Sequence, residues 1–130
     1  MALDRVIVTH VRKSGFPEVR RSHGRVMSQL VHEDGQRARV LARNAGLTAQ
    51  SMGELIDDLE SQGLVVRKDD PDDRRAKRVF LTARGRRAAD ASGVAVRQIE
   101  RTLAEMLGAD YARVRAAALK VIERYGVETE

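Results

Sequence analysis

Cysteine and long apolar runs are both absent from the sequence, and each absence removes a class of protein. Without cysteine, the chain has no disulfide scaffold, no thiolate zinc site and no thiol-based redox sensor. No stretch approaches the ~20 apolar residues that span a bilayer, so we expect no membrane among its partners. The first residues carry Asp4 and Arg5 and lack the apolar core and cleavage site of a secretory signal, which indicates a cytoplasmic protein.

Patterns typical of catalytic and metal sites are also absent. Ser22 and His23 do not lie on a strand-to-helix nucleophile elbow, and the sequence contains no Gly-x-Ser-x-Gly motif. His10, His23 and His32 fit no metal-ligand spacing on one helix, and we interpret His23 as a residue that packs or forms hydrogen bonds. We therefore predict that the protein is not an enzyme and that it holds no metal and no cofactor.

What the sequence has in excess is positive charge carried by arginine. Lys and Arg number 24 against 19 Asp and Glu, and only Lys13, Lys68, Lys77 and Lys120 are lysines. The planar arginine head pairs with phosphates and with base edges, which suits a nucleic-acid partner. A solvated basic surface explains the charge alone equally well.

Apolar spacing predicts a mainly α protein with one small β-hairpin. The 130 residues, of which 42% are hydrophobic, suffice for one folded domain. We predict helices over 3–14, from Pro17 to about 33, 39–45, 48–62, 82–107 and 110–125, with a break at Gly108. The β-branched run 6–8 would also suit a strand. The runs 64–68 and 78–81 predict a hairpin joined by a long polar connector, 69–77.

Two of these helices form a tight pair directly before the hairpin. Gly46 is placed to end the first of them in a left-handed conformation, and Thr48 is placed to cap the second. A helix pair with a tight turn, followed by a two-stranded hairpin, is the layout of a winged helix-turn-helix. The sequence therefore predicts that the helix from Thr48 to Gln62 enters the major groove of duplex DNA.

Short polar residues begin this reader helix. Thr48, Ala49, Gln50 and Ser51 allow close approach to base edges, and Gln50 can pair with adenine. The alternative is an ordinary exposed helix face.

Two acidic residues follow on the same helix. Glu54 and Asp58 would repel phosphates, so they either accept hydrogen bonds from cytosine amino groups or face basic neighbours, and we favour the basic neighbours.

The predicted hairpin changes from acidic to basic along its length. Asp73 is close enough in sequence to hold the Arg75 side chain, and this arginine could then enter a narrow minor groove. Arg74, Lys77 and Arg78 are candidates for phosphate contacts. The alternative is a charged loop that binds nothing.

The hairpin sequence DPDDRRAKRVFLTARG, residues 70–85, resembles the wing signature of the MarR family. The stretch from Leu41 to Val65, with its Gly46-Leu47-Thr48 turn, is similar to the reader helix and first wing strand of that family. Arg39 and Val40 stand where the family commonly has Ser-Glu. The resemblance implies a dimeric repressor, usually ligand-responsive, whose wing arginine, Arg75, probes the minor groove.

The resemblance also implies how the chain is organised. A single domain over 1–130 would comprise dimerisation helices 1–16 and 108–130, a winged helix-turn-helix 17–81 and a long linking helix 82–107. The dimerisation residues would be Leu3, Ile7, Val11, Tyr111, Val114, Val121 and Tyr125.

We therefore hypothesise a homodimer that places two reader helices in successive major grooves, ~34–36 Å apart, on a near-palindromic operator. It would act as a repressor, released by a small-molecule effector of unknown identity. Two alternatives remain open: a winged-helix module that binds another protein, and an architectural protein that binds duplex DNA without sequence preference.

Overall fold

The computed structural model describes residues 2–125, except for the side chains of residues 2, 122 and 125. The chain divides into two compact units, residues 1–95 and 96–130. The boundary lies inside the long helix α5 (Ala83–Leu107). Within the described residues, no helix is both long enough and apolar enough to cross a membrane.

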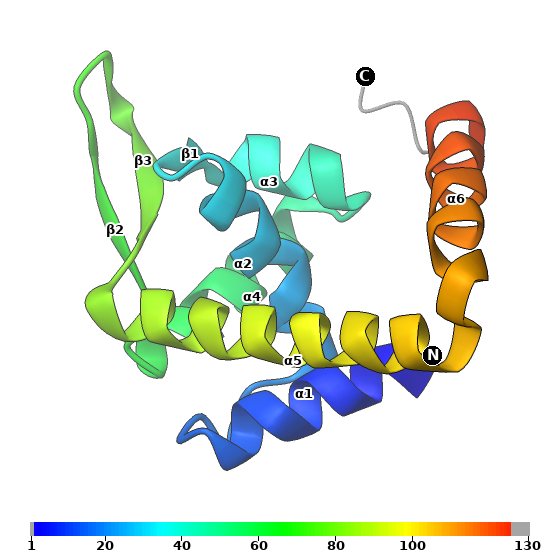
Figure 1. Cartoon of the computed structure of the whole chain (residues 1–130). Helices are drawn as coiled ribbons and strands as arrows, with labels where there is room; N and C mark the ends of the chain where they lie inside the picture. Colours follow the sequence, from blue (N-terminus) through cyan, green and yellow to red (C-terminus); the bar gives the residue numbers. More distant parts are fainter. Residues whose placement is uncertain (1, 126–130) are drawn as a thin grey trace. The chain divides into compact units, whose positions relative to one another are not determined.

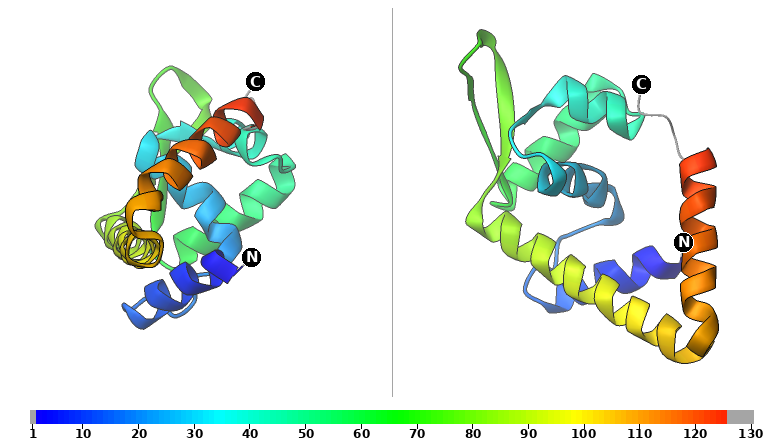
Figure 2. Two further views of the ribbon diagram at one scale, coloured as in Figure 1. Left: turned by 45° about the vertical axis from the view of Figure 1, so that its right-hand side comes forward. Right: turned by 45° about the horizontal axis from the view of Figure 1, so that its top comes forward.

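The first unit is a helical bundle with a small sheet, as the sequence predicts (Figure 1). It contains α1 (Ala2–Lys13), α2 (Arg21–His32), β1 (Gln36–Arg37), α3 (Ala38–Ala45), α4 (Ala49–Ser61), β2 (Val65–Asp70), β3 (Asp73–Leu81) and the start of α5. The sheet is antiparallel, in the order β1, β3, β2. The hairpin of β2 and β3, which we call the wing, projects past α2 and α3 in two views (Figures 1 and 2).

One hydrophobic core fixes the helices of this unit. Its fully buried members come from α2, α3, α4, the turn after α4 and the strands: Val26, Leu30, Leu41, Met52, Ile56, Leu59, Leu64, Val65 and Val79. Burying a side chain of this size is worth ~1.5–3 kcal/mol. Because α4 gives three of them from one face, its opposite face is left at the surface.

The turn between α3 and α4 forms as predicted. Gly46 has φ +64° and ψ +34°, the left-handed conformation that only glycine adopts cheaply. Thr48 Oγ1 accepts a hydrogen bond from the Ser51 N–H at 3.1 Å and so caps α4. Local residues therefore fix where α4 begins.

The prediction of a long polar connector over residues 69–77 is wrong, because the two strands continue almost to the tip of the hairpin. β2 ends at Asp70, β3 begins at Asp73, and only Pro71 and Asp72 lie between them. Asp69 and Lys77 are register partners and form an ion pair, which allows the charged residues to stay in the ladder.

The predicted start of α2 at Pro17 is also wrong. The helix begins at Arg21, and the Arg20 N–H donates to Nδ1 of His23 at 3.0 Å. The imidazole thus accepts a hydrogen bond from a backbone donor at the helix start, in agreement with the interpretation of His23 as a residue that packs or forms hydrogen bonds. Strand β1 was not predicted, since a two-residue strand leaves no periodic pattern.

The second unit contains the rest of α5, a short 3₁₀ helix (Gly108–Asp110) and α6 (Tyr111–Tyr125). Gly108, with φ +54°, breaks the helix as predicted. Several large apolar side chains of this unit are exposed: Val96, Leu103, Met106, Leu107, Val114, Leu119 and Val121.

We predict that Gly85→Ala strongly destabilises the protein. A Cβ at Gly85 would lie 1.9 Å from the Leu64 carbonyl oxygen, so α5 could not lie as close as it does to the turn before β2. The free energy of unfolding, measured in urea, should fall by about 3 kcal/mol or more. Gly24→Ala is the control: its Cβ meets nothing within 4 Å, and the change should add ~0.5–1 kcal/mol. Equal effects of the two substitutions would contradict this packing.

Candidate nucleic-acid interface

The N-terminal half of α4 presents the predicted reader residues at the surface. Thr48, Ala49, Gln50, Ser51 and Glu54 are all exposed. The opposite face of α4 is held in the core by Met52, Ile56 and Leu59. The helix is therefore rigidly supported on one side and open on the side that carries these residues.

The C-terminal half of α4 is tied to the wing by Arg67 of β2. Its guanidinium pairs with Asp57 at 2.7 Å and with Glu60 at 3.2 Å. It also donates to the Gly53 carbonyl at 3.4 Å. One arginine thus compensates two α4 carboxylates and connects the first wing strand to the reader helix.

Asp58 is tied to α2 instead. His23 is completely buried, and because its Nδ1 accepts the Arg20 N–H, its Nε2 carries the proton that is donated to Asp58 Oδ2 at 2.7 Å. The Arg20 guanidinium also pairs with this carboxylate, and Gln62 Nε2 lies 3.4 Å from it. These hydrogen bonds, first from His23 and then from Arg20 and Gln62, lower the pKa of Asp58. The predictions of a basic neighbour for Asp58 and of hydrogen bonding for His23 are confirmed.

The prediction that Glu54 faces a basic neighbour is wrong. Its only side-chain hydrogen bond within residues 2–125 comes from Gln50, whose Nε2 lies 3.4 Å from Glu54 Oε1. The basic side chains that compensate the other α4 carboxylates come from β2 and from the start of α2, and within residues 2–125 none of them forms an ion pair with Glu54.

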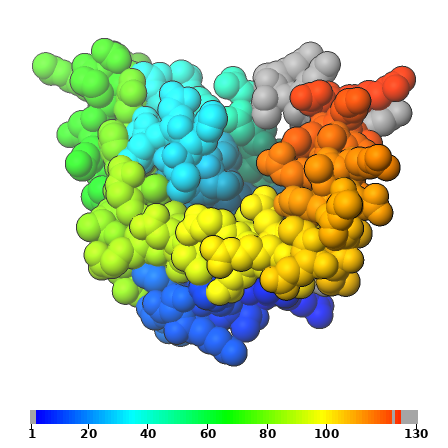
Figure 3. Space-filling model, in the orientation of Figure 1, coloured from blue at the N-terminus to red at the C-terminus, as the bar shows by residue number. Residues whose placement is uncertain are grey.

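The wing carries two arginines whose side chains have no partner within the described part of the chain. Arg74 and Arg75 are exposed next to the turn of the wing, the green hairpin that lies at the surface in Figure 3. Asp73 Oδ1 accepts the backbone N–H of Arg75 at 3.0 Å. The expected contact between Asp73 and the Arg75 side chain is therefore wrong: Asp73 shapes the backbone and leaves the guanidinium available.

Lys77 and Arg78 differ from these two, because both are engaged with carboxylates of the wing. Lys77 pairs with Asp69 across the ladder. Arg78 lies 3.1 Å from Asp70 Oδ2 and 3.3 Å from Asp72 Oδ2.

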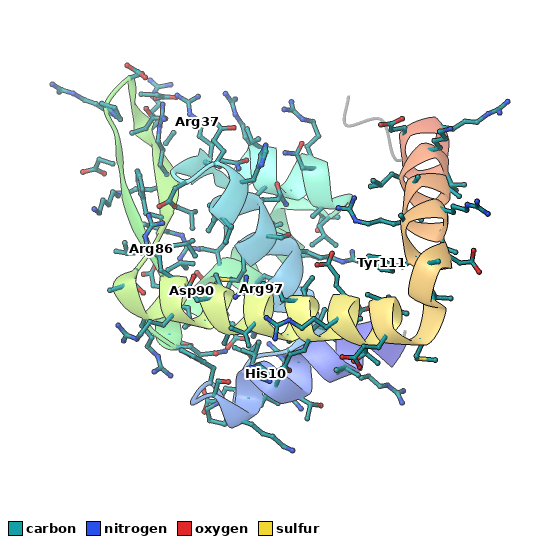
Figure 4. All side chains as sticks on the ribbon, viewed as in Figure 1. His10, Arg37, Arg86, Asp90, Arg97 and Tyr111 are labelled. Carbon is teal, nitrogen blue, oxygen red and sulfur yellow. The ribbon has the colours of Figure 1, made fainter. Side chains whose placement is uncertain are left out.

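Asp70 is the buried charge that joins the wing to α3. Its side chain has no exposed area, and its Oδ2 accepts from Arg37 Nε at 2.5 Å. Asp72 N–H donates to its other oxygen at 2.9 Å. These bonds, with that from Arg37 foremost, hold the pKa of Asp70 far below its usual range. Arg37 stands directly before α3, beside the wing (Figure 4).

Sequence reasoning missed Arg37 and Asp70, and of two arginines on α3 it named only Arg39, as a departure from the family pattern. Arg39 and Arg43 lie four residues apart, are exposed, and have no side-chain partner within residues 2–125. Helical i, i+4 spacing on the helix before the reader helix was the signal that could have identified them.

The residues predicted for dimerisation are placed unevenly. Leu3 is 56% exposed and Ile7 half-buried, whereas Val11 lies in the core of the first unit. In the second unit Tyr111 is half-buried, and Val114 and Val121 are exposed. The side chain of Tyr125 lies outside the described residues.

We predict that Asp58 makes stability depend on pH. Its folded-state pKa lies below the ordinary 3.8, so its stabilisation is present above that value and is lost as the pH falls through the lower one. The difference in unfolding free energy between wild type and Asp58→Asn should be largest near neutral pH and should narrow below about pH 4. Asp57→Asn, with its side chain 71% exposed, should give a small difference throughout. An Asp58→Asn difference that is the same at acidic and neutral pH would rule this out.

We further predict that Asp70→Asn loosens the wing. The substitution removes a buried charge, takes away the ion-pair partner of Arg37 and leaves Arg78 with the exposed Asp72 alone. Amide hydrogen exchange in β2 and β3 should accelerate by roughly tenfold or more, with little change in α4. Asp69→Asn is the matched control, because that carboxylate is 78% exposed. If both variants exchange alike, the buried pair does not hold the wing.

Comparisons with known proteins agree with this arrangement. The MarR family model matches residues 19–76. A search of curated proteins gives no match.

Solved structures share the fold over most of the chain. The PcaV transcriptional regulator from Streptomyces coelicolor, in complex with its natural ligand, is 25% identical, with a TM-score of 0.66 over 92% of this chain and 84% of that chain. A MarR transcriptional regulator from Methanosarcina mazei Go1 is 22% identical, with a TM-score of 0.75 over 99% and 94%. A mutant of Staphylococcus aureus MepR bound to an oligodeoxyribonucleotide is 20% identical, with a TM-score of 0.70 over 95% and 89%. The matched segment contains the reader helix, β2 and the first residues of β3, so this part of the chain is similar to the MarR family, and the solved structures share its fold.

Proposed function

We propose that this protein is a homodimeric transcription regulator that binds a near-palindromic operator in duplex DNA and represses the adjacent gene. The observation that carries the proposal is that an exposed reader surface on α4 and an uncompensated arginine pair on the wing are held on the same rigid unit. One feature suits a major groove and the other a flanking minor groove.

Each predicted site residue has a role in this proposal. Thr48, Ala49, Gln50, Ser51 and Glu54 face base edges, with the α4 N-terminus close to a phosphate. Arg75 enters the minor groove, and Arg74, Lys77, Arg39 and Arg43 contact phosphates. Arg78, which also lies 3.1 Å from Asp70, contacts a phosphate as well, and Asp73 supports the wing by accepting the N–H of Arg75.

We assign dimerisation to helices 1–16 and 108–130, DNA binding to 17–81 and the link between them to 82–107. The exposed apolar residues Leu3, Val6, Val114 and Val121 support this assignment, because a dimer interface would remove them from water. A dimer would bring two reader helices to successive major grooves.

A small-molecule effector that releases the operator is part of the proposal. The PcaV structure with its natural ligand and the DNA-bound MepR structure support both kinds of partner by similarity. The effector must bind the conformation that is incompatible with DNA more tightly, because only differential affinity shifts the population. Because a regulator must reach its operator, the proposal includes a cytoplasmic location. Binding an operator requires no catalytic activity, so the proposal includes no enzymatic function.

The test is to recover genomic fragments bound by the purified protein at physiological salt and to sequence them. We expect a recurrent inverted repeat, bound at least about a thousandfold more tightly than random duplex. Recovery without a motif would favour the architectural alternative, and no recovery would favour the protein-binding module.

Arg75→Ala should weaken binding to the selected operator by roughly tenfold or more, because a minor-groove contact is lost. Lys13→Ala, which removes one exposed positive charge from α1, is the control and should have little effect. Equal affinity of the Arg75 variant and wild type would contradict the role of the wing.

A further inference from the structure

The four carboxylates of α4 are not equivalent, although all lie on the helix that is proposed to enter the groove. Asp57 and Glu60 are compensated by Arg67, and Asp58 by His23 and Arg20. Glu54 alone has no cationic partner within residues 2–125. An uncompensated carboxylate on a surface that approaches phosphates is unfavourable unless it gains a hydrogen-bond donor there.

The position of Glu54 determines what that donor can be. It stands four residues after Gln50, one helical turn along the same exposed face. Gly53, directly before it, has no side chain, and a Cβ built there meets nothing within 4 Å. No side chain therefore projects from the helix at the position before Glu54, and this allows the Glu54 carboxylate to come close to a base edge.

The chemistry of the major groove then selects one base. Guanine and thymine present only acceptors and a methyl group there, and these repel or fail to bond a carboxylate. Adenine places its N7 acceptor next to its N6 donor, so the second carboxylate oxygen would be repelled. Cytosine presents its N4 amino donor without an adjacent acceptor on the same base.

We propose that Glu54 is a specificity-determining residue that accepts a hydrogen bond from the N4 amino group of one cytosine in each operator half-site. The inference rests on the proposed function and adds to it the identity of one base. Gln50 reads a neighbouring position, and the weak contact between Gln50 and Glu54 gives way to the two base contacts.

The experiment is selection from a random duplex library with full-length wild type, Glu54→Gln and Glu60→Gln. Glu60→Gln is the matched control, since it removes the same charge from the same helix but from a residue paired with Arg67. Wild type and Glu60→Gln should both require cytosine at one position of each half-site. Glu54→Gln should lose about tenfold or more of that discrimination and keep the rest of the motif.

The outcomes distinguish a failure of the Glu54 inference from a failure of the proposed function. If wild type selects an inverted repeat and Glu54→Gln keeps the full cytosine preference, this inference is overturned and the proposed function stands. If wild type selects no motif, the proposed function fails and the inference fails with it. Glu54→Ala, at an exposed position, repeats the test without an amide that can donate, and it should lose the same preference.

Discussion

Helix α4 has to bury one face and leave the other open, and the first unit is arranged around that constraint. Met52, Ile56 and Leu59 hold it in the core. Polar contacts then fix it from two sides, through His23 of α2 and Arg67 of β2. Neither contact engages the exposed side chains of residues 48–51 and 54. The reader surface is consequently preorganised, which lowers the cost of ordering it when it binds.

The charged side chains of the first unit also fall into two groups, those that are compensated by a partner and those that are left exposed. Carboxylates at the core side and along the wing ladder have cationic partners, among them Asp58, Asp69 and Asp70. The arginines at the wing turn and on α3 have no such partner in the described part of the chain, so positive charge remains where the phosphates would lie. A net excess of five positive charges thus matters less than which of the charges are already compensated.

Local features could be predicted from the sequence, and features that depend on distant partners could not. Gly46 and Thr48 fix the helix-turn-helix through contacts within a few residues, and both were predicted. The wing length depends on Asp70, whose partner Arg37 is 33 residues away. Glu54 and Asp58 look alike in sequence, yet only Asp58 meets His23, which is 35 residues away. Base contacts of the reader residues stay predictions.

The central claim is that two reader helices and two wings of a symmetric dimer contact one operator. Hydroxyl-radical footprinting of the wild-type protein on its selected operator tests it most directly. The account predicts a symmetric pattern, with two protected half-sites about one helical turn apart and minor-groove protection on each outer flank. A single unsymmetric block of protection, or half-site protection without the flanks, would contradict it.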